Sequence, residues 1–144
     1  ISFVMPAADL MLQFTKDGVK QTEAIEVPAD NEEEPVVDVP ALHTIEHLGA
    51  TFLRNSAQKE NIVYFGPMGC RTGCYLVMFG KLTSEDVYPL VMEMLDFIGF
   101  EGEIPGAKPE ECGNYSEQNL NMAKFYAKKY KDALEKDKSL VYPD

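Results

Sequence analysis

The chain has 144 residues, of which 45% are hydrophobic and 26% charged, so we expect one compact domain over residues 1–144. Its 24 aspartates and glutamates outnumber its 13 lysines and arginines, and the formal net charge is -11. This charge repels phosphate groups and no basic cluster offsets it, so neither nucleic acid nor an anionic membrane is an expected partner. No apolar run approaches the roughly 20 residues that a membrane-spanning helix needs.

The cysteine content and the first residues both bear on the compartment. Three cysteines, at positions 70, 74 and 112, are too few and odd in number for a disulfide framework. The opening residues, Ile-Ser-Phe-Val-Met, contain no basic segment of an export signal. We therefore expect a cytoplasmic protein in which a cysteine serves as a ligand, a nucleophile or a packing residue.

Two short apolar stretches open the series of predicted elements. Residues 10–14 and 23–27 are separated by an Asp-Gly pair and are interpreted as a β-hairpin. A helix follows, because apolar residues recur at helical spacing over residues 42–55. Pro40 suits the first turn of this helix, and Asp38 suits its N-cap.

The middle of the chain alternates between strand and helix signals. Residues 61–65 and 74–79 are strand-like and flank a glycine-rich link. Thr83 then begins a capping box in front of a long apolar stripe at helical spacing. Pro89 either kinks this helix or marks its true start, and Gly99 is expected to end it.

The last part of the chain is predicted as a loop followed by a helix. Residues 99–115 are rich in glycine and proline, which predicts irregular structure. A final helix is expected from Ser116, with an inner face made of Leu120, Ala123, Ala127, Tyr130 and Leu134. Short strands with flanking helices, in no regular alternation, predict an α+β fold in which an antiparallel sheet packs against helices.

The stretch His43-Thr-Ile-Glu46-His47 lies on the first predicted helix and holds both histidines of the chain. Residues four apart are about 40° apart around a helix and one turn along it, so both rings can reach one ion. Glu46 is displaced about 60° from His43, close enough for proton transfer beside a metal. The pattern H-x-x-E-H is a known zinc signature. The alternative is that the two histidines are unrelated surface residues. We predict that this helix binds one divalent metal.

The cysteines are the next candidates for chemistry. A catalytic metal usually has a third protein ligand, and Cys112, with Gly113 after it, is the best one because a thiolate suits zinc, cobalt or ferrous iron. The alternative for Cys112 is a buried apolar thiol. Cys70 lies in the glycine-rich link, where adjacent Arg71, or a nearby metal, would favour the reactive thiolate; the alternative is a structural cysteine at a strand end. Cys74 begins a strand and is expected in the core.

Three segments together resemble a known family. HTIEHLGATFLRN (43–55), GPMGCRTG (66–73) and EGEIPGAKPEECGNY (101–115) are similar to the S-ribosylhomocysteine lyase (LuxS) family in order and spacing, over about residues 35–134. The resemblance implies a metal-dependent carbon–sulfur lyase that isomerises the ribose of S-ribosylhomocysteine and eliminates homocysteine. The other product would be 4,5-dihydroxy-2,3-pentanedione, the precursor of the quorum-sensing signal autoinducer-2. The resemblance also implies a homodimer with active sites at the subunit interface.

The resemblance also implies roles for individual residues. It implies that one divalent ion, Fe2+ or Zn2+, is bound by three protein ligands: His43, His47 and Cys112. It makes Glu46 and Cys70 the catalytic residues, which move protons on the two sides of the sugar. Arg54 matches an arginine at the end of the metal-binding helix, and Arg54 and Arg71 are expected to contact the substrate.

The first third of the chain departs from the family pattern. Members usually begin with Ser-Phe, two residues and Asp-His, whereas Ser2-Phe3 is followed here by Val-Met-Pro-Ala. A family arginine ahead of the metal-binding helix falls near Glu26 or Val27 in this chain. Two alternatives therefore stand beside the lyase: a homologue with the same metal site and a different sugar thioether, and a non-catalytic metal- or ligand-binding homologue. A metallopeptidase, a class in which H-x-x-E-H also occurs, is disfavoured by the short chain and the cysteine ligand.

Overall fold

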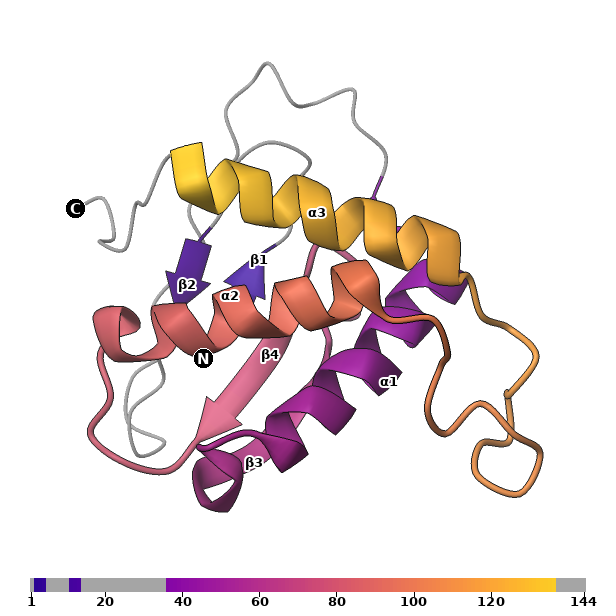
Figure 1. Ribbon diagram of the computed structural model, residues 1–144, viewed down its shortest axis with the longest axis horizontal. Helices are drawn as coiled ribbons and strands as arrows, with labels where there is room; N and C mark the ends of the chain where they lie inside the picture. Colours follow the sequence, from indigo (N-terminus) through magenta and orange to yellow (C-terminus); the bar gives the residue numbers. More distant parts are fainter. Residues whose placement is uncertain (1, 5–10, 14–35, 137–144) are drawn as a thin grey trace.

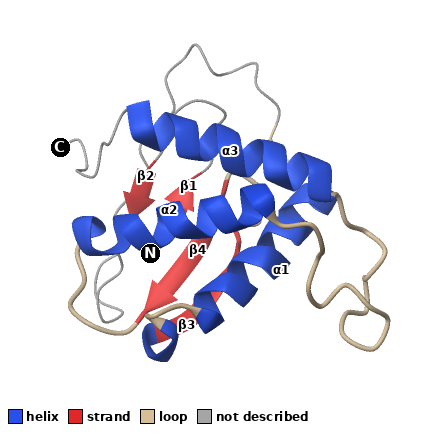
Figure 2. Cartoon of the chain, in the orientation of Figure 1, coloured by secondary structure: helices blue, strands red, loops and turns tan. Residues whose placement is uncertain are grey.

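The computed structural model describes residues 2–4, 11–13 and 36–136, which form an antiparallel sheet with helices packed on one side of it (Figure 1). The strands are β1 (Ser2–Val4), β2 (Met11–Gln13), β3 (Ile62–Pro67) and β4 (Gly73–Met78). The helices are α1 (Val39–Asn55), α2 (Ser84–Phe100) and α3 (Leu120–Lys136), with a 3-10 turn at Lys59–Asn61. The strand order is β2-β1-β4-β3, and Figure 2 shows the strands behind the helices. The predicted α+β class is confirmed.

The predicted N-terminal hairpin is confirmed only for its first arm. β2 lies within the predicted stretch 10–14, but its antiparallel partner is β1, which sequence reasoning did not predict. The other predicted arm, residues 23–27, lies outside the described residues. β1 also pairs with β4, so Phe3 is opposite Cys74 and Val4 is opposite Gly73. The beginning of the chain is therefore joined to the strand that follows the glycine-rich link.

Helix α1 carries the histidines and begins as predicted. The Asp38 side chain accepts a hydrogen bond of 2.9 Å from the Ala41 N–H, and Pro40 occupies the first turn, where its missing N–H costs nothing. One side of α1 enters the core through Ala41, Leu42, Ile45, Leu48 and Leu53. Both histidines and Glu46 are half-buried at the edge of this face, so they are fixed by packing and still accessible.

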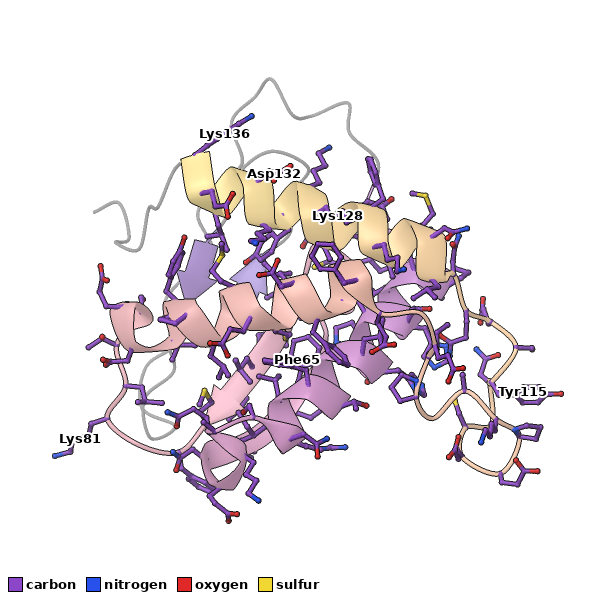
Figure 3. All side chains as sticks on the ribbon, in the orientation of Figure 1. Phe65, Lys81, Tyr115, Lys128, Asp132 and Lys136 are labelled. Atoms are coloured by element: carbon purple, nitrogen blue, oxygen red, sulfur yellow. The ribbon has the colours of Figure 1, made fainter. Side chains whose placement is uncertain are left out.

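The hairpin of β3 and β4 lies against α1. Alternate residues of β4 point to the helices, and Cys74, Leu76 and Met78 are buried there. The expectation that Cys74 belongs to the core is confirmed, because it is 0% exposed. Phe65 is opposite Leu76 in β4 and reaches the interior beside α1, as Figure 3 shows. A methyl group on Gly49 would come within 2.4 Å of the Phe65 ring, so this glycine permits the contact.

Helix α2 begins at the predicted capping box and ends differently from the prediction. The Thr83 hydroxyl accepts from the Asp86 N–H while the Asp86 carboxylate accepts from the Thr83 N–H. The helix begins at Ser84, so Pro89 lies inside it and is not its start. Gly99 does not end it either, because the helix continues to Phe100. Gly99 is buried against α3, where a methyl group would make an ordinary contact with the Lys128 side chain at 3.4 Å.

Helix α3 begins later than predicted but buries the expected residues. It starts at Leu120, and the Asn119 side chain accepts a hydrogen bond of 3.0 Å from the Met122 N–H. Of the five predicted inner residues, Leu120 is half-buried. The other four are buried: Ala123, Ala127, Tyr130 and Leu134. None of the helices in the described ranges combines the length and apolar character needed to span a bilayer.

The contact between Gly49 and Phe65 yields the first prediction. Gly49→Ala should lower the free energy of unfolding by about 1–3 kcal/mol, because the added carbon overlaps a buried ring in a packed core. Gly99→Ala is the matched control, a buried helical glycine with room for a methyl group, and should leave stability unchanged or raise it by up to about 1 kcal/mol. Urea unfolding followed by circular dichroism measures both. Equal stability of the two variants would contradict this account of the packing.

Candidate metal centre

The structure brings the three predicted metal ligands together. The Nε2 atoms of His43 and His47 are 3.0 Å apart, and the Cys112 Sγ is 3.6 Å from the His43 Nε2. The ligand atoms of all three residues lie within 4.8 Å of one another. Two of these residues are one turn apart on α1, and the third comes from the loop that joins α2 to α3. Two imidazoles and a thiolate form a donor set that binds zinc or ferrous iron.

The backbone fixes the orientation of both imidazoles. The His43 Nδ1 is 2.9 Å from the Glu117 carbonyl oxygen, and the His47 Nδ1 is 2.9 Å from the Pro105 carbonyl oxygen. A carbonyl can only accept a hydrogen bond, so each Nδ1 carries the proton and donates it. Each Nε2 then presents a lone pair toward the other, and two lone pairs at this separation repel unless they share a cation. The residues present therefore fit a divalent ion, and the carbonyls complete the outer contacts typical of a metal-bound histidine.

Both carbonyls and Cys112 belong to one loop, residues 101–119, which runs beside the first half of α1 (orange in Figure 1). Gly106 allows this loop to approach α1 closely. Its φ of 74° is in the left-handed region, and a Cβ at this position would come within 2.9 Å of the His47 Nδ1. Figure 3 shows Tyr115 projecting outward from the same loop. The loop thus contacts α1 closely at His47 and is open to solvent at its tip.

Thr44 attaches the end of this loop to α1. It is 0% exposed, and its hydroxyl is 2.7 Å from the Gln118 Oε1, to which it donates. The Thr44 oxygen also accepts a hydrogen bond of 2.9 Å from the Asn119 N–H. Because Thr44 directly follows His43 and Gln118 directly follows Glu117, this attachment sets the distance between His43 and its carbonyl partner.

Cys112 is held by the backbone of its own loop. Its N–H donates to the Lys108 carbonyl oxygen at 3.0 Å, as does the N–H of Glu111 at 2.9 Å. This turn directs the side chain toward His43, and the residue is half-buried. The alternative of a buried apolar thiol is therefore wrong for Cys112.

Glu46 is placed by α1 beside the second histidine. It is half-buried on α1, one residue before His47. Burial strongly raises the pKa of the Cys74 thiol, and the negative charge of Glu46 raises it further. Glu46 is thus close enough to act on a group at the base of the hairpin.

Cys70 is exposed in the turn between β3 and β4. Its Sγ is 2.9 Å from the Thr72 Oγ1. The pKa of Cys70 is lowered, chiefly by the hydrogen bond with the Thr72 hydroxyl and further by backbone N–H groups, against a smaller opposing effect of burial. The alternative of a structural, packed cysteine is wrong. Among the described residues, the groups that lower the pKa of Cys70 are neutral hydrogen-bond donors, and the prediction that Arg71 or a nearby metal favours the thiolate stays a prediction.

The two predicted substrate-binding arginines are placed differently. Arg71 follows Cys70 in the turn and has a φ of 62°, which is rare for a residue with a side chain. Arg54 is exposed in the last turn of α1, 11 residues after His43 and therefore about 16 Å further along the helix axis. Within one chain, the structure does not bring Arg54 to the metal ligands. The substrate contacts of both arginines stay predictions.

An open pocket of about 390 Å³ lies beside the metal centre. It shares Pro105 and Gly106 with the contacts of His47, and its other walls include Thr51, Phe97 and Glu103. None of the three metal ligands lines it. The pocket therefore borders the outer contacts of the centre and is separate from its donor atoms.

Several residues that build the centre were not found from the sequence. The carbonyl partners at Pro105 and Glu117 carry no side-chain signal, since any residue offers a carbonyl. Thr44 looked like an ordinary helix residue inside the H-x-x-E-H motif. Gly106 did give a signal, because a glycine directly after a proline predicts a turn. The sequence did not indicate that this turn packs on His47.

Comparisons with known proteins agree with this geometry. The family model described as S-Ribosylhomocysteinase (LuxS) matches residues 13–140. A protein named S-ribosylhomocysteine lyase from Finegoldia magna is 53% identical over 114 residues, which cover 77% of this chain and 72% of that protein. Another of the same name from Clostridium acetobutylicum is 53% identical over 116 residues, covering 78% and 73%. A third, from Borreliella burgdorferi, is 51% identical over 114 residues, covering 76% and 73%.

The close approach of Gly106 to His47 yields the second prediction. Gly106→Ala should lower the affinity for Zn2+ by about 10- to 100-fold, because the added carbon displaces the imidazole from its carbonyl partner. Competition with a chromophoric chelator measures the affinity. Gly102→Ala, in the same loop and with open space around the added carbon, is the control and should bind as the parent does. Unchanged affinity of Gly106→Ala would show that His47 does not depend on this contact.

Proposed function

The chain belongs to the S-ribosylhomocysteinase (LuxS) family, and from this membership we propose that it is a carbon–sulfur lyase acting on S-ribosylhomocysteine. The reaction isomerises the ribose and eliminates homocysteine, which leaves 4,5-dihydroxy-2,3-pentanedione, the precursor of autoinducer-2. The observation that carries the proposal is the convergence of His43, His47 and Cys112 in a chain about half identical to proteins named for this activity. The enzyme would thus take part in quorum sensing.

We propose that His43, His47 and Cys112 hold one Fe2+ or Zn2+ ion. The facing Nε2 lone pairs and the adjacent thiol support this assignment. A divalent ion in this position would supply Lewis-acid polarisation of a sugar oxygen, which makes the neighbouring C–H more acidic. The residues of the chain that move protons are then separate from those that hold the metal.

Cys70 and Glu46 are proposed as the proton-transferring pair. The Cys70 sulfur is exposed and favoured as the thiolate, so it can accept a proton from a sugar carbon. Glu46 is half-buried beside His47, and its charge acts on Cys74 of β4, which suits a carboxylate that carries protons on the other side of the sugar. A metal that only stabilised the fold would need neither group, so their presence supports a catalyst over a purely binding homologue.

A second candidate follows from the altered N-terminal segment. The chain's only two histidines are both assigned to the metal, and its arginines are Arg54 and Arg71. The histidine and the arginine that the family uses ahead of α1 therefore have no counterpart. This observation supports the second candidate function, in which the chain is a homologue that keeps the metal chemistry and acts on a different sugar thioether.

We propose that the functional form is a cytoplasmic homodimer. The outer face of the sheet carries exposed apolar side chains on β3 and β4, including Val63, Tyr64 and Tyr75. A second copy of this chain would cover such a face, and a face of this kind is usual in stable dimers. All three cysteines are free thiols, as is usual in a reducing compartment.

The third prediction tests the activity itself. Protein purified without oxygen, loaded with Fe2+ or Co2+ and given S-ribosylhomocysteine should release homocysteine, which a thiol reagent detects. Cys70→Ala should retain the metal and lose activity by at least about 100-fold, because it removes the proton acceptor and no ligand. His47→Ala should lose both metal and activity. Protein with one metal per chain that releases no homocysteine would contradict the proposed substrate and favour the different sugar thioether.

The fourth prediction concerns the dimer. Tyr75→Glu should shift the protein from dimer to monomer in sedimentation velocity, because it buries a charge in the proposed interface. Phe125→Glu is the matched control, since Phe125 is exposed on α3, away from the sheet, and should leave the dimer intact. A monomeric parent protein at micromolar concentration would contradict the dimer. Dimers in both variants would contradict the sheet face as its interface.

A further inference from the structure

The turn that carries Cys70 has an unusual backbone. The Met68 N–H donates to the Gly73 carbonyl at 2.8 Å, and the Arg71 N–H donates to the Met68 carbonyl at 3.0 Å. These bonds close a tight turn, and Arg71 reverses the chain direction through its left-handed φ of 62°. Consecutive N–H groups around a left-handed residue form a concave site that favours a negative charge. The turn therefore brings Cys70 and Thr72, the residues before and after Arg71, close together.

Cys70 and Thr72 meet at the Cys70 sulfur. The Thr72 hydroxyl is 2.9 Å from the Sγ, which is a close contact for oxygen and sulfur. When the sulfur is a thiolate it has no proton to donate, so the hydroxyl must be the donor. Backbone N–H groups of Cys70 and Thr72 also favour the charged form. In the part of the chain that the structure describes, no charged side chain contributes to the lowered pKa of Cys70.

We propose that Thr72 is the positioning residue for Cys70, donating its hydroxyl hydrogen to the sulfur so that the thiolate is both stabilised and held in one orientation. The inference rests on the proposed function, which gives the Cys70 thiolate its task as proton acceptor. A hydroxyl suits that task because it is neutral. The hydroxyl stabilises the thiolate by hydrogen bonding and carries no positive charge that would form an ion pair with the sulfur. The sulfur therefore keeps its ability to accept a proton.

The side chain at position 72 has little freedom to act otherwise. Threonine is β-branched, so few χ1 rotamers are open to it, and the turn fixes its backbone. Its neighbour Gly73 is buried and pairs with Val4 of β1, which anchors the end of the turn in the sheet. The hydroxyl is consequently held at the sulfur by strand pairing, and Arg71 contributes its backbone conformation more than its charge.

The test measures how readily Cys70 is alkylated as a function of pH, in metal-loaded protein without substrate. Trypsin cleaves after Lys59 and Arg71, so Cys70 is on the peptide of residues 60–71 and Cys74 is on the next peptide. Mass spectrometry of iodoacetamide-treated protein thus follows Cys70 alone. Thr72→Val keeps the shape and removes the hydroxyl. It should raise the pH midpoint of alkylation and slow the reaction about tenfold at pH 6, because the thiolate loses its donor.

Two further variants distinguish the Thr72 hydroxyl from the Arg71 charge. Thr72→Ser restores a hydroxyl and should return the midpoint toward that of the parent, which a purely structural role for Thr72 does not predict. Arg71→Asn removes the charge while tolerating the left-handed conformation, and the midpoint should stay in place. This variant loses the tryptic site between the two cysteines, so fragment ions of the longer peptide assign the label to Cys70 or Cys74.

Two outcomes would overturn the proposal. One is a midpoint that moves with Arg71→Asn and not with Thr72→Val, which would assign the effect to the charge. The other is a serine variant that behaves like valine, which would show that the hydroxyl has no part in it. If Thr72→Val does not fold, Thr72→Ala removes the same hydroxyl and takes its place in both comparisons.

The alkylation result does not depend on the proposed reaction. Alkylation needs no substrate, so the role of Thr72 is decided even if no homocysteine is released. Where homocysteine is released, Thr72→Val should lower kcat strongly at pH 6 and weakly at pH 9, since at high pH the thiolate forms without the hydroxyl. An equal loss at both pH values would show that Thr72 acts on the fold and not on the sulfur.

Discussion

The metal centre depends above all on how the loop of residues 101–119 is fixed to α1. Two carbonyls of this loop hold the protonated nitrogens of His43 and His47, and the buried Thr44 hydroxyl joins Gln118 and Asn119 to the same helix. Without these contacts the two imidazoles could turn and the Cys112 thiol would have no fixed position. The loop is irregular, yet these four hydrogen bonds fix it to α1, and it supplies the third ligand beside the two that α1 provides.

The parts of the site that sequence reasoning found are those set by local spacing or by a side chain's own chemistry. His43, Glu46 and His47 could be placed on one side of a helix from the 3.6-residue period alone. Cys112 was identified because few residue types bind such metals. What could not be predicted depends on backbone contacts between distant segments: the carbonyls of Pro105 and Glu117, and the fit of Gly106 against His47. The end of α2 was also missed, because Gly99 is part of the helix and does not adopt the left-handed conformation of a C-terminal glycine cap.

Charge was a poorer guide than geometry at Cys70. The arginine next to it in the sequence suggested a cation beside a thiolate, but the structure gives that role to a neutral hydroxyl two residues away. The difference arises because the left-handed conformation of Arg71 brings residues 70 and 72 together, and such a conformation is rarely predicted for arginine. Cys74, only four residues on, shows the opposite environment, in which burial and the Glu46 charge keep the thiol protonated. The same hairpin thus separates one reactive cysteine from one inert cysteine.

The hairpin also brings the start of the chain close to the turn that carries Cys70. The metal ligands, Glu46 and Cys70 all lie between residues 43 and 112, and their partners extend only to residue 119. The departure from the family pattern begins at Pro6, two residues after Val4, and Val4 pairs with Gly73, the residue after Thr72. Strand β1 therefore ends beside the turn that carries Cys70. Among the described residues, the metal ligands come from α1 and the loop of residues 101–119, so the start of the chain is joined to the turn of Cys70 through β4 and not through the metal ligands.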